Sequence, residues 1–162
     1  RFKIEYAIGA VLAIVHDALI MVAFIVWSRM EFNTQSIAAI LTILGYSIND
    51  TIVQFDRIRE ERKLRPNEKF EDVLNESLTI TLGRTIITTF ATLLTVFSLI
   101  VFMSGSNRDF ALALLVGMIS GTYSTVYIAS AFVLWWENHK EKREKAKLAK
   151  SGSQANQPVV KA

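Results

Sequence analysis

A single aspartate, Asp50, interrupts an otherwise uncharged apolar stretch of twenty residues, Ser36 to Phe55. A carboxylate within a membrane-spanning helix costs about 2.5–3.5 kcal/mol on insertion scales, so such residues lie mostly in bundle interiors or water-filled cavities. Asp50 is therefore the first candidate for a titrating or ion-coupled group. The alternative is that Asp50 only pairs with a cation and holds the helices together.

Arg84 is the candidate cation for Asp50, because it stands at the start of the third apolar stretch. Asp50 lies six residues before Asp56, where the second stretch ends. About 9 Å of helix therefore separates Asp50 from that membrane surface. An arginine side chain can reach inward from the surface. We predict a proton-coupling pair of Asp50 and Arg84, with an interfacial positive charge as the alternative role for Arg84.

Three neighbours of Asp50 are predicted to support it. Tyr46 lies one helical turn earlier and shares its face. Asn49 flanks the carboxylate and can bond a neighbouring helix, and Gly45 lets another helix approach closely.

A second polar pair, His16 and Asp17, lies near the middle of the first apolar stretch. Adjacent helical residues point about 100° apart, so the two side chains can flank a wide groove but cannot share one narrow site. They indicate either a proton relay or a structural network that ties helices together. Two residues are too few for a metal site, and the absence of cysteine excludes a thiolate site.

Small and hydroxyl residues mark the last two apolar stretches. Gly117 and Gly121 form a small-xxx-small pattern, which predicts close helix packing. The threonines of the third stretch can line a polar path, but bonds to carbonyls of their own helix are slightly favoured. These threonines are Thr85, Thr88, Thr89, Thr92 and Thr95.

These residues lie on four predicted spans of an all-α, polytopic transmembrane helix bundle. Hydrophobic residues make up 51% of the 162-residue chain and charged residues only 20%, and the charges are confined to a few windows. Each apolar window is near the roughly 20 residues needed to cross a bilayer, or longer. The predicted spans are residues 4–28, 35–56, 84–104 and 109–136, in a transmembrane domain of residues 1–137.

The distribution of positive charge predicts how the bundle is oriented. Sixteen of the eighteen Lys and Arg residues precede the first span, follow the fourth, or lie between the second and third. The positive-inside rule then places both termini and this middle connection in the cytoplasm. The connection should hold an amphipathic helix over about residues 67–82, either interfacial or packed on cytoplasmic residues. Residues 138–162 form a basic tail, with disorder expected from Ser151.

Other function classes find little support in the sequence. It lacks the glycine-rich phosphate loop and the G-x-S-x-G and H-E-x-x-H patterns, so we predict no enzyme activity and no cofactor or metal besides a coupling ion. No nucleic-acid partner is expected, because the basic residues flank apolar spans. The chain starts at Arg1 just before a span, so we expect an N-terminal part to precede it.

The run GYSINDTIVQFDRIREER, residues 45–62, closely resembles the signature of the SecF proteins of the SecD/SecF family. Three further segments agree in order and spacing: AIVHDALI at 13–20, RTIITT at 84–89 and FALALLVGMISGTYSTVYIASA at 110–131. The resemblance implies a half of the RND superfamily type, here without its first two spans and the extracytoplasmic domain between them.

The resemblance also implies roles for single residues. The family's proton-linked aspartate and arginine fall on Asp50 and Arg84. The Asp-Arg pair after the span falls on Asp56 and Arg57, for which we expect an interfacial structural or gating role. The family's H-D pair falls on the histidine and aspartate of the first span. Gln54 is more polar than the apolar residue that the resemblance leads us to expect at its place.

The function implied by the resemblance is that of a membrane subunit of the Sec protein-export machinery in the bacterial cytoplasmic membrane. It would use the proton motive force, with sodium as an alternative coupling ion, to assist late steps of preprotein translocation after SecA has pushed. Implied partners are SecD, the SecYEG channel with SecA, the exporting polypeptide and the lipid bilayer. Two rival functions are a proton-driven RND-type efflux transporter for small molecules and a passive scaffold subunit of the export complex.

Overall fold

The computed structural model describes residues 4–155, and all of its regular structure is helical. The long helices are α1 (Ile4–Trp27), α2 (Thr34–Leu64), α3 (Phe70–Phe102), α4 (Ser106–Tyr123) and α5 (Ser130–Ala155). A π-helical segment, η1 (Ser124–Ala129), joins α4 to α5. No strand occurs among these residues, so the all-α prediction is confirmed.

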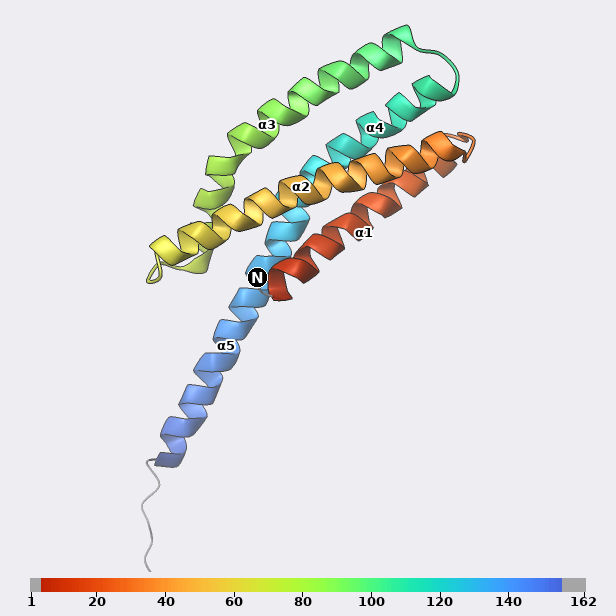
Figure 1. Ribbon diagram of the computed structural model, residues 1–162. Coiled ribbons are helices and arrows are strands. Elements are labelled where there is room, and N and C mark those ends of the chain that lie inside the picture. The colour runs from red at the N-terminus through yellow and green to blue at the C-terminus, as the bar shows by residue number, and fades with distance from the viewer. Residues whose placement is uncertain (1–3, 156–162) are drawn as a thin grey trace, which may run out of the picture.

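The helices form two antiparallel hairpins that pack on each other (Figure 1). The turn between α1 and α2 and the turn between α3 and α4 lie at the same end, which we call the hairpin end. The α2–α3 connection lies at the opposite end, which we call the connection end, and α5 leaves the bundle there. Because α2 packs against α1, α3 and α4, its side chains can reach three other helices.

Local signals at the hairpin end fix where the helices start. The side chain of Asn33 accepts hydrogen bonds from the backbone N–H groups of Gln35 and Ser36, at 3.0 and 3.1 Å. The Ser36 hydroxyl in turn accepts from the Asn33 N–H, which completes a capping box for α2. Gly105 takes a positive φ of 58° before α4, a conformation that glycine adopts without strain.

Four helical segments are long and apolar enough to cross a membrane. Their outward faces carry large apolar side chains as well as their inward ones; on α3, Ile87 is 70% exposed and Phe102 is 85% exposed. A helix that is apolar on all sides is stable in lipid rather than in water. The chain is therefore a multi-pass membrane protein with the four spans that the sequence predicts.

Two helices extend beyond the predicted spans. α2 continues to Leu64, whereas the predicted span ends at residue 56. α3 is one continuous helix from Phe70, so the amphipathic helix expected over about residues 67–82 and the span expected at 84–104 are not separate elements. Gly83, the one glycine between them, lowers helix propensity by only about 1 kcal/mol, which the flanking turns override. That the amphipathic segment over about residues 67–82 lies along the membrane surface stays a prediction.

The tail also differs in part from its prediction. Disorder is expected from Ser151, but residues 151–155 form the end of α5. Residues 156–162, where the rest of the expected disorder falls, lie outside the described part of the chain.

α4, η1 and α5 together make one helix with an inward stripe at every fourth residue. An ideal α-helix has 3.6 residues per turn, so such a stripe drifts by about 40° at each step. The π-helical turn is wider and takes up part of this drift. The buried residues of the stripe are Ala113, Gly117, Gly121, Thr125, Ala129 and Val133.

The glycines predicted to allow close packing do not all do so. A Cβ atom on Gly117 would lie 2.5 Å from the Met21 Sδ and 2.6 Å from the Ile43 Cγ1, so these side chains would have to shift before any larger residue could fit there. A Cβ on Gly121 would meet the Ser47 Cβ at 3.6 Å, which is ordinary contact. A Cβ on Gly45 would meet nothing within 4 Å. The predicted helix approach at Gly45 is therefore absent among the described residues, because Gly45 lies on an exposed part of α2.

We expect Gly117→Ala to lower the free energy of unfolding by about 1–3 kcal/mol, because the added methyl group pushes the Met21 and Ile43 side chains away from α4. Gly45→Ala is the matched control and should be neutral or stabilise by up to about 1 kcal/mol through helix propensity. Thermal unfolding in detergent, followed by the helical circular dichroism signal, measures both variants. Equal melting temperatures for the two would contradict the tight contact at Gly117.

Candidate functional site

Asp50 lies half-buried between α2 and α3, and both of its carboxylate oxygens accept hydrogen bonds. The Thr85 Oγ1 of α3 donates to Oδ1 at 3.0 Å. The Gln54 Nε2, one turn further along α2, donates to Oδ2 at 3.3 Å. Neither donor carries a charge, so the carboxylate is held by neutral groups from two helices.

Arg84 does not form the ion pair that the sequence predicts. Among the described residues, no salt bridge joins Arg84 to Asp50, and the Arg84 side chain is exposed. Adjacent residues on a helix point about 100° apart, and the inward position of α3 belongs to Thr85, which is 2% exposed. The positive charge of Arg84 still acts on Asp50, but through space.

A line of hydroxyl groups continues from Asp50 toward the hairpin end. Tyr46, predicted to share the face of Asp50, places its hydroxyl 3.1 Å from the Thr89 Oγ1 of α3. The Thr89 hydroxyl lies 3.3 Å from the Thr122 Oγ1 of α4. The polar side of α2 is therefore linked to α3 and α4. Bonds to carbonyls of the same helix, favoured by the sequence, are found instead at Thr88, Thr92 and Thr95.

Asp17 is the most deeply buried carboxylate among the described residues, with no exposed surface. Its Oδ2 accepts hydrogen bonds from the Ser47 hydroxyl of α2 at 2.6 Å and from the Ser124 hydroxyl of η1 at 2.8 Å. Its Oδ1 accepts a longer bond from Ser120 of α4 at 3.4 Å. The Nδ1 of His16 lies 3.2 Å from the same Oδ1.

The network predicted for the His16–Asp17 pair is present, and further helices contribute partners to it. The two side chains meet each other directly instead of flanking a wide groove, because the imidazole bends back to the adjacent carboxylate. The His16 side chain is 33% exposed, so it connects the sealed carboxylate with the outer surface of α1. Close to these serines, the Thr51 and Thr125 hydroxyls meet at 3.3 Å and tie α2 to η1. Whether the pair also relays protons stays a prediction.

The two carboxylates lie against different sides of α2. Tyr46, Asp50 and Gln54 follow one another at four-residue intervals, and the first two of them bond threonines of α3. Ser47 and Thr51 are offset from these residues by about 100° and face α1 and η1. A rotation of α2 would therefore disturb both sites together.

Asn49, predicted to support Asp50, and the Asp56–Arg57 pair, predicted to have an interfacial structural or gating role, lie away from the Asp50 carboxylate. Asn49 and Asp56 are exposed. Arg57 pairs with Glu60 at 2.8 Å and with Glu61 at 2.6 Å, on the α2 extension beyond the predicted span. This arrangement agrees with a structural role for Arg57 at the connection end.

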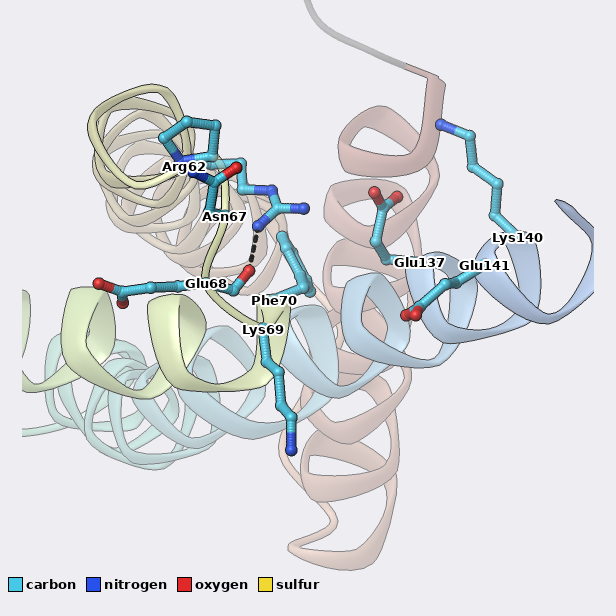
Figure 2. Close-up of a pocket in the computed structure, with 9 residues that line it drawn as sticks. Arg62, Asn67, Glu68, Lys69, Phe70, Glu137, Lys140 and Glu141 are labelled. Carbon is cyan, nitrogen blue, oxygen red and sulfur yellow. Dashed lines mark hydrogen bonds between the residues drawn. The ribbon is translucent and has the colours of Figure 1, made fainter. Parts of the chain in front are cut away.

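The connection end carries a dense set of ion pairs. Arg65 lies 3.6 Å from Glu61 and 3.7 Å from Glu68, and it also donates two hydrogen bonds to Glu76 of α3. The Arg62 guanidinium donates to the Glu68 carbonyl oxygen at 2.7 Å (Figure 2). These bonds clamp the α2–α3 connection.

Figure 2 shows the residues that line a hollow beside this clamp, between the α2–α3 connection and α5. The volume of the hollow is about 380 Å³. Lysine, arginine and glutamate side chains line it in equal numbers of each sign, so the lining has no net charge that would favour an anion. In the described part of the chain, no group of three or more His, Cys, Asp or Glu residues lies close enough to hold a metal ion. The hollow is lined by Arg62, Pro66, Asn67, Glu68, Lys69, Phe70, Glu137, Lys140 and Glu141.

Sequence reasoning missed the serine ligands of Asp17 and the part played by Gln54. Serine in a membrane helix often bonds its own backbone, so its presence gives no sign of a partner. The one available signal was the high free-energy cost of burying the Asp17 carboxylate in a membrane helix. That cost is offset only if several hydrogen-bond donors from other helices surround the carboxylate. For Gln54, the signal was its four-residue distance from Asp50.

The family model described as protein export membrane protein SecD/SecF, C-terminal, matches residues 1–139. The protein translocase subunit SecF of Treponema pallidum is 56% identical over 133 residues, which are 82% of this chain and 32% of that protein. The SecF subunit of Borreliella burgdorferi is 51% identical over 134 residues, 83% of this chain and 45% of that protein.

Fused proteins and a solved structure give the same result. The protein translocase subunit SecDF of Thermus thermophilus is 43% identical over 148 residues, 91% of this chain and 20% of that protein. A crystal structure of SecDF in the super-membrane-facing form superposes with a TM-score of 0.85 at 41% identity, covering 88% of this chain and 20% of that one. The chain thus spans between a fifth and a half of the length of these relatives. It belongs to the SecD/SecF family of protein export membrane proteins and corresponds to the C-terminal membrane part of SecF.

Proposed function

We propose that this chain is the ion-coupling membrane part of a Sec protein-export subunit, which uses the proton motive force to assist late steps of preprotein translocation after SecA. The observation that carries the proposal is Asp50, a half-buried carboxylate that neutral donors hold between α2 and α3. Relatives named protein translocase subunit SecF and SecDF support protein export as the process. We expect the chain to be a coupling subunit and not an enzyme.

Protonation of Asp50 would change the contact between α2 and α3. A hydrogen bond to an ionised acceptor is roughly twice as strong as one between neutral groups. The bond from Thr85 therefore weakens when Asp50 gains a proton, and the attraction of Arg84 is lost at the same time. One proton moving across a potential of 100 mV releases about 2.3 kcal/mol, which is enough to shift such a contact.

The fused relatives and the exposed apolar surface of α3 indicate which partners this chain would have. The SecDF relatives carry both names in one protein, which supports SecD as the partner of this chain. α3 presents exposed apolar residues such as Phe90 and Phe97, which lipid or the SecD half would cover. SecYEG with SecA and the exporting polypeptide complete the pathway, in the bacterial cytoplasmic membrane with both termini in the cytoplasm.

A passive scaffold is the second candidate function, and Asp17 is the observation that favours it. Its carboxylate is sealed and bonded by three serine hydroxyls from other helices, as expected for a permanent structural contact. The two functions differ in which carboxylate matters for export once the protein has folded.

We expect Asp50→Asn to abolish the uncoupler-sensitive part of reporter-protein export, because asparagine cannot exchange a proton, while the protein accumulates normally. Asp72→Asn, the same change at an exposed position of α3, is the matched control and should leave export unchanged. Export of a reporter in cells with and without a proton uncoupler measures both. Full uncoupler-sensitive export in Asp50→Asn would reject the proton role and favour the scaffold.

For Arg84, the absence of a direct ion pair predicts tolerance to lysine. Arg84→Lys keeps the charge and should retain at least half of the uncoupler-sensitive export, whereas Arg84→Gln should lose most of it. The same export assay compares the two variants at equal protein levels. Equal loss in both would show that the guanidinium geometry matters, which a charge acting through space does not require.

Asp17→Leu should lower the free energy of unfolding by about 1–3 kcal/mol, because it removes the acceptor of the buried Ser47 hydroxyl and leaves Ser124 bonded only to the Gly121 carbonyl oxygen of its own helix. The melting temperature in detergent and the amount of protein in the membrane should both fall. Asp50→Asn serves as the comparison and should melt near the unaltered protein. A stable Asp17→Leu protein that is inactive in export would instead assign Asp17 to the coupling step.

A further inference from the structure

The side chain of Gln54 is buried yet only half satisfied. It is 2% exposed, and its Nε2 donates to the Asp50 Oδ2 at 3.3 Å. In the part of the chain that the structure describes, no donor reaches its Oε1 atom, which is also buried. Buried polar atoms are nearly always bonded, so a free acceptor directly beside a titrating carboxyl calls for an explanation.

The chemistry of the two groups supplies one. An ionised carboxylate only accepts hydrogen bonds, whereas a protonated carboxyl also donates one through its O–H. A glutamine amide offers a donor at Nε2 and an acceptor at Oε1. The terminal torsion of glutamine is broad and roughly two-fold, so a half turn exchanges the two ends without disturbing the rest of the side chain.

We propose that Gln54 is a positioning residue for the proton step at Asp50, with an amide that turns over when the carboxyl gains or loses its proton. In the ionised state Nε2 donates to Asp50, as the structure has it. When a proton binds at Oδ2, the new O–H donates to Oε1, which is otherwise unpaired. The proposal rests on the proposed function and specifies how its site keeps the same geometry in both protonation states.

The other groups near Asp50 leave this task to Gln54. Thr85 of α3 already commits its hydroxyl proton to Oδ1. Arg84 of α3 adds only charge, and Tyr46 of α2 meets Thr89 rather than Asp50. From α4, the uncharged Thr122 contacts Thr89 and does not reach Asp50. Asp17 of α1 is bonded to Ser47, on the other side of α2.

The proposal predicts how the titration of Asp50 responds when the amide is removed. A donor bonds an ionised carboxylate more strongly than an acceptor bonds a neutral carboxyl, so Gln54 stabilises the ionised state more. Gln54→Met keeps the shape of the side chain but removes both bonds. Protonation should then occur at higher pH, with the midpoint shifted upward by about half to one pH unit.

The test follows the carbonyl stretch of protonated Asp50 by infrared difference spectroscopy, in the export subunit that carries this sequence, reconstituted in lipid bilayers. Asp50→Asn identifies the band. Gln54→Met should shift the midpoint of its pH titration upward, and Gln35→Met, the same change near the start of α2, should leave it in place. An unshifted midpoint in a stable Gln54→Met protein would overturn the proposal.

A second readout detects the turning amide itself. In protein with ¹⁵N-labelled glutamine side chains, the Gln54 Nε2 resonance, identified by its loss in Gln54→Met, should titrate with the same midpoint as Asp50. It should become independent of pH in Asp50→Asn. A resonance that stays constant while Asp50 titrates would rule out the turnover and leave the proton role of Asp50 intact. Absence of any Asp50 titration would overturn the proposed function and the role of Gln54 together.

Discussion

A carboxylate inside a membrane must find its hydrogen-bond donors within the protein, because lipid offers none. This constraint governs how the helices of the chain are placed. Asp17 draws donors from α2, α4 and η1, and Asp50 draws them from α2 and α3. Apolar packing between membrane helices has little directional preference, since lipid tails are as apolar as leucine. The hydrogen bonds to the two carboxylates therefore fix the relative orientation of the helices, which apolar packing alone would leave undetermined.

The two sites differ in how firmly the protein holds them. Asp17 is sealed and receives three hydroxyl bonds from other helices, so it anchors α1 to the bundle. Asp50 is half-buried, and one of its two donors sits on its own helix. Within residues 4–155, Thr85 makes the one hydrogen bond from α3 to this carboxylate. A group that must change its charge during function is expected at the less tightly held position, and Asp50 occupies that position.

Sequence reasoning reached the spans and the important carboxylates because both depend on local properties. An apolar window of sufficient length and a charge inside it can be read from neighbouring residues alone. The rotation of each helix about its axis depends instead on its packing partners. For this reason the inward position was predicted for Arg84 but belongs to Thr85, and Gly45 faces outward although its small size suggested a contact. The serines around Asp17 were missed for the same reason.

The π-helical segment η1 sets the phase between the two halves of the longest helix. Up to Gly121 the inward stripe packs toward α2 and Asp17, and after it Ala129 and Val133 pack beside Gly9 of α1. Loss or gain of a single residue within 124–129 would turn every later side chain by about 100° around the helix axis. The aromatic cluster of Phe132, Trp135 and Trp136 would turn with it. The length of η1 therefore determines the direction in which each face of α5 points relative to the rest of the bundle.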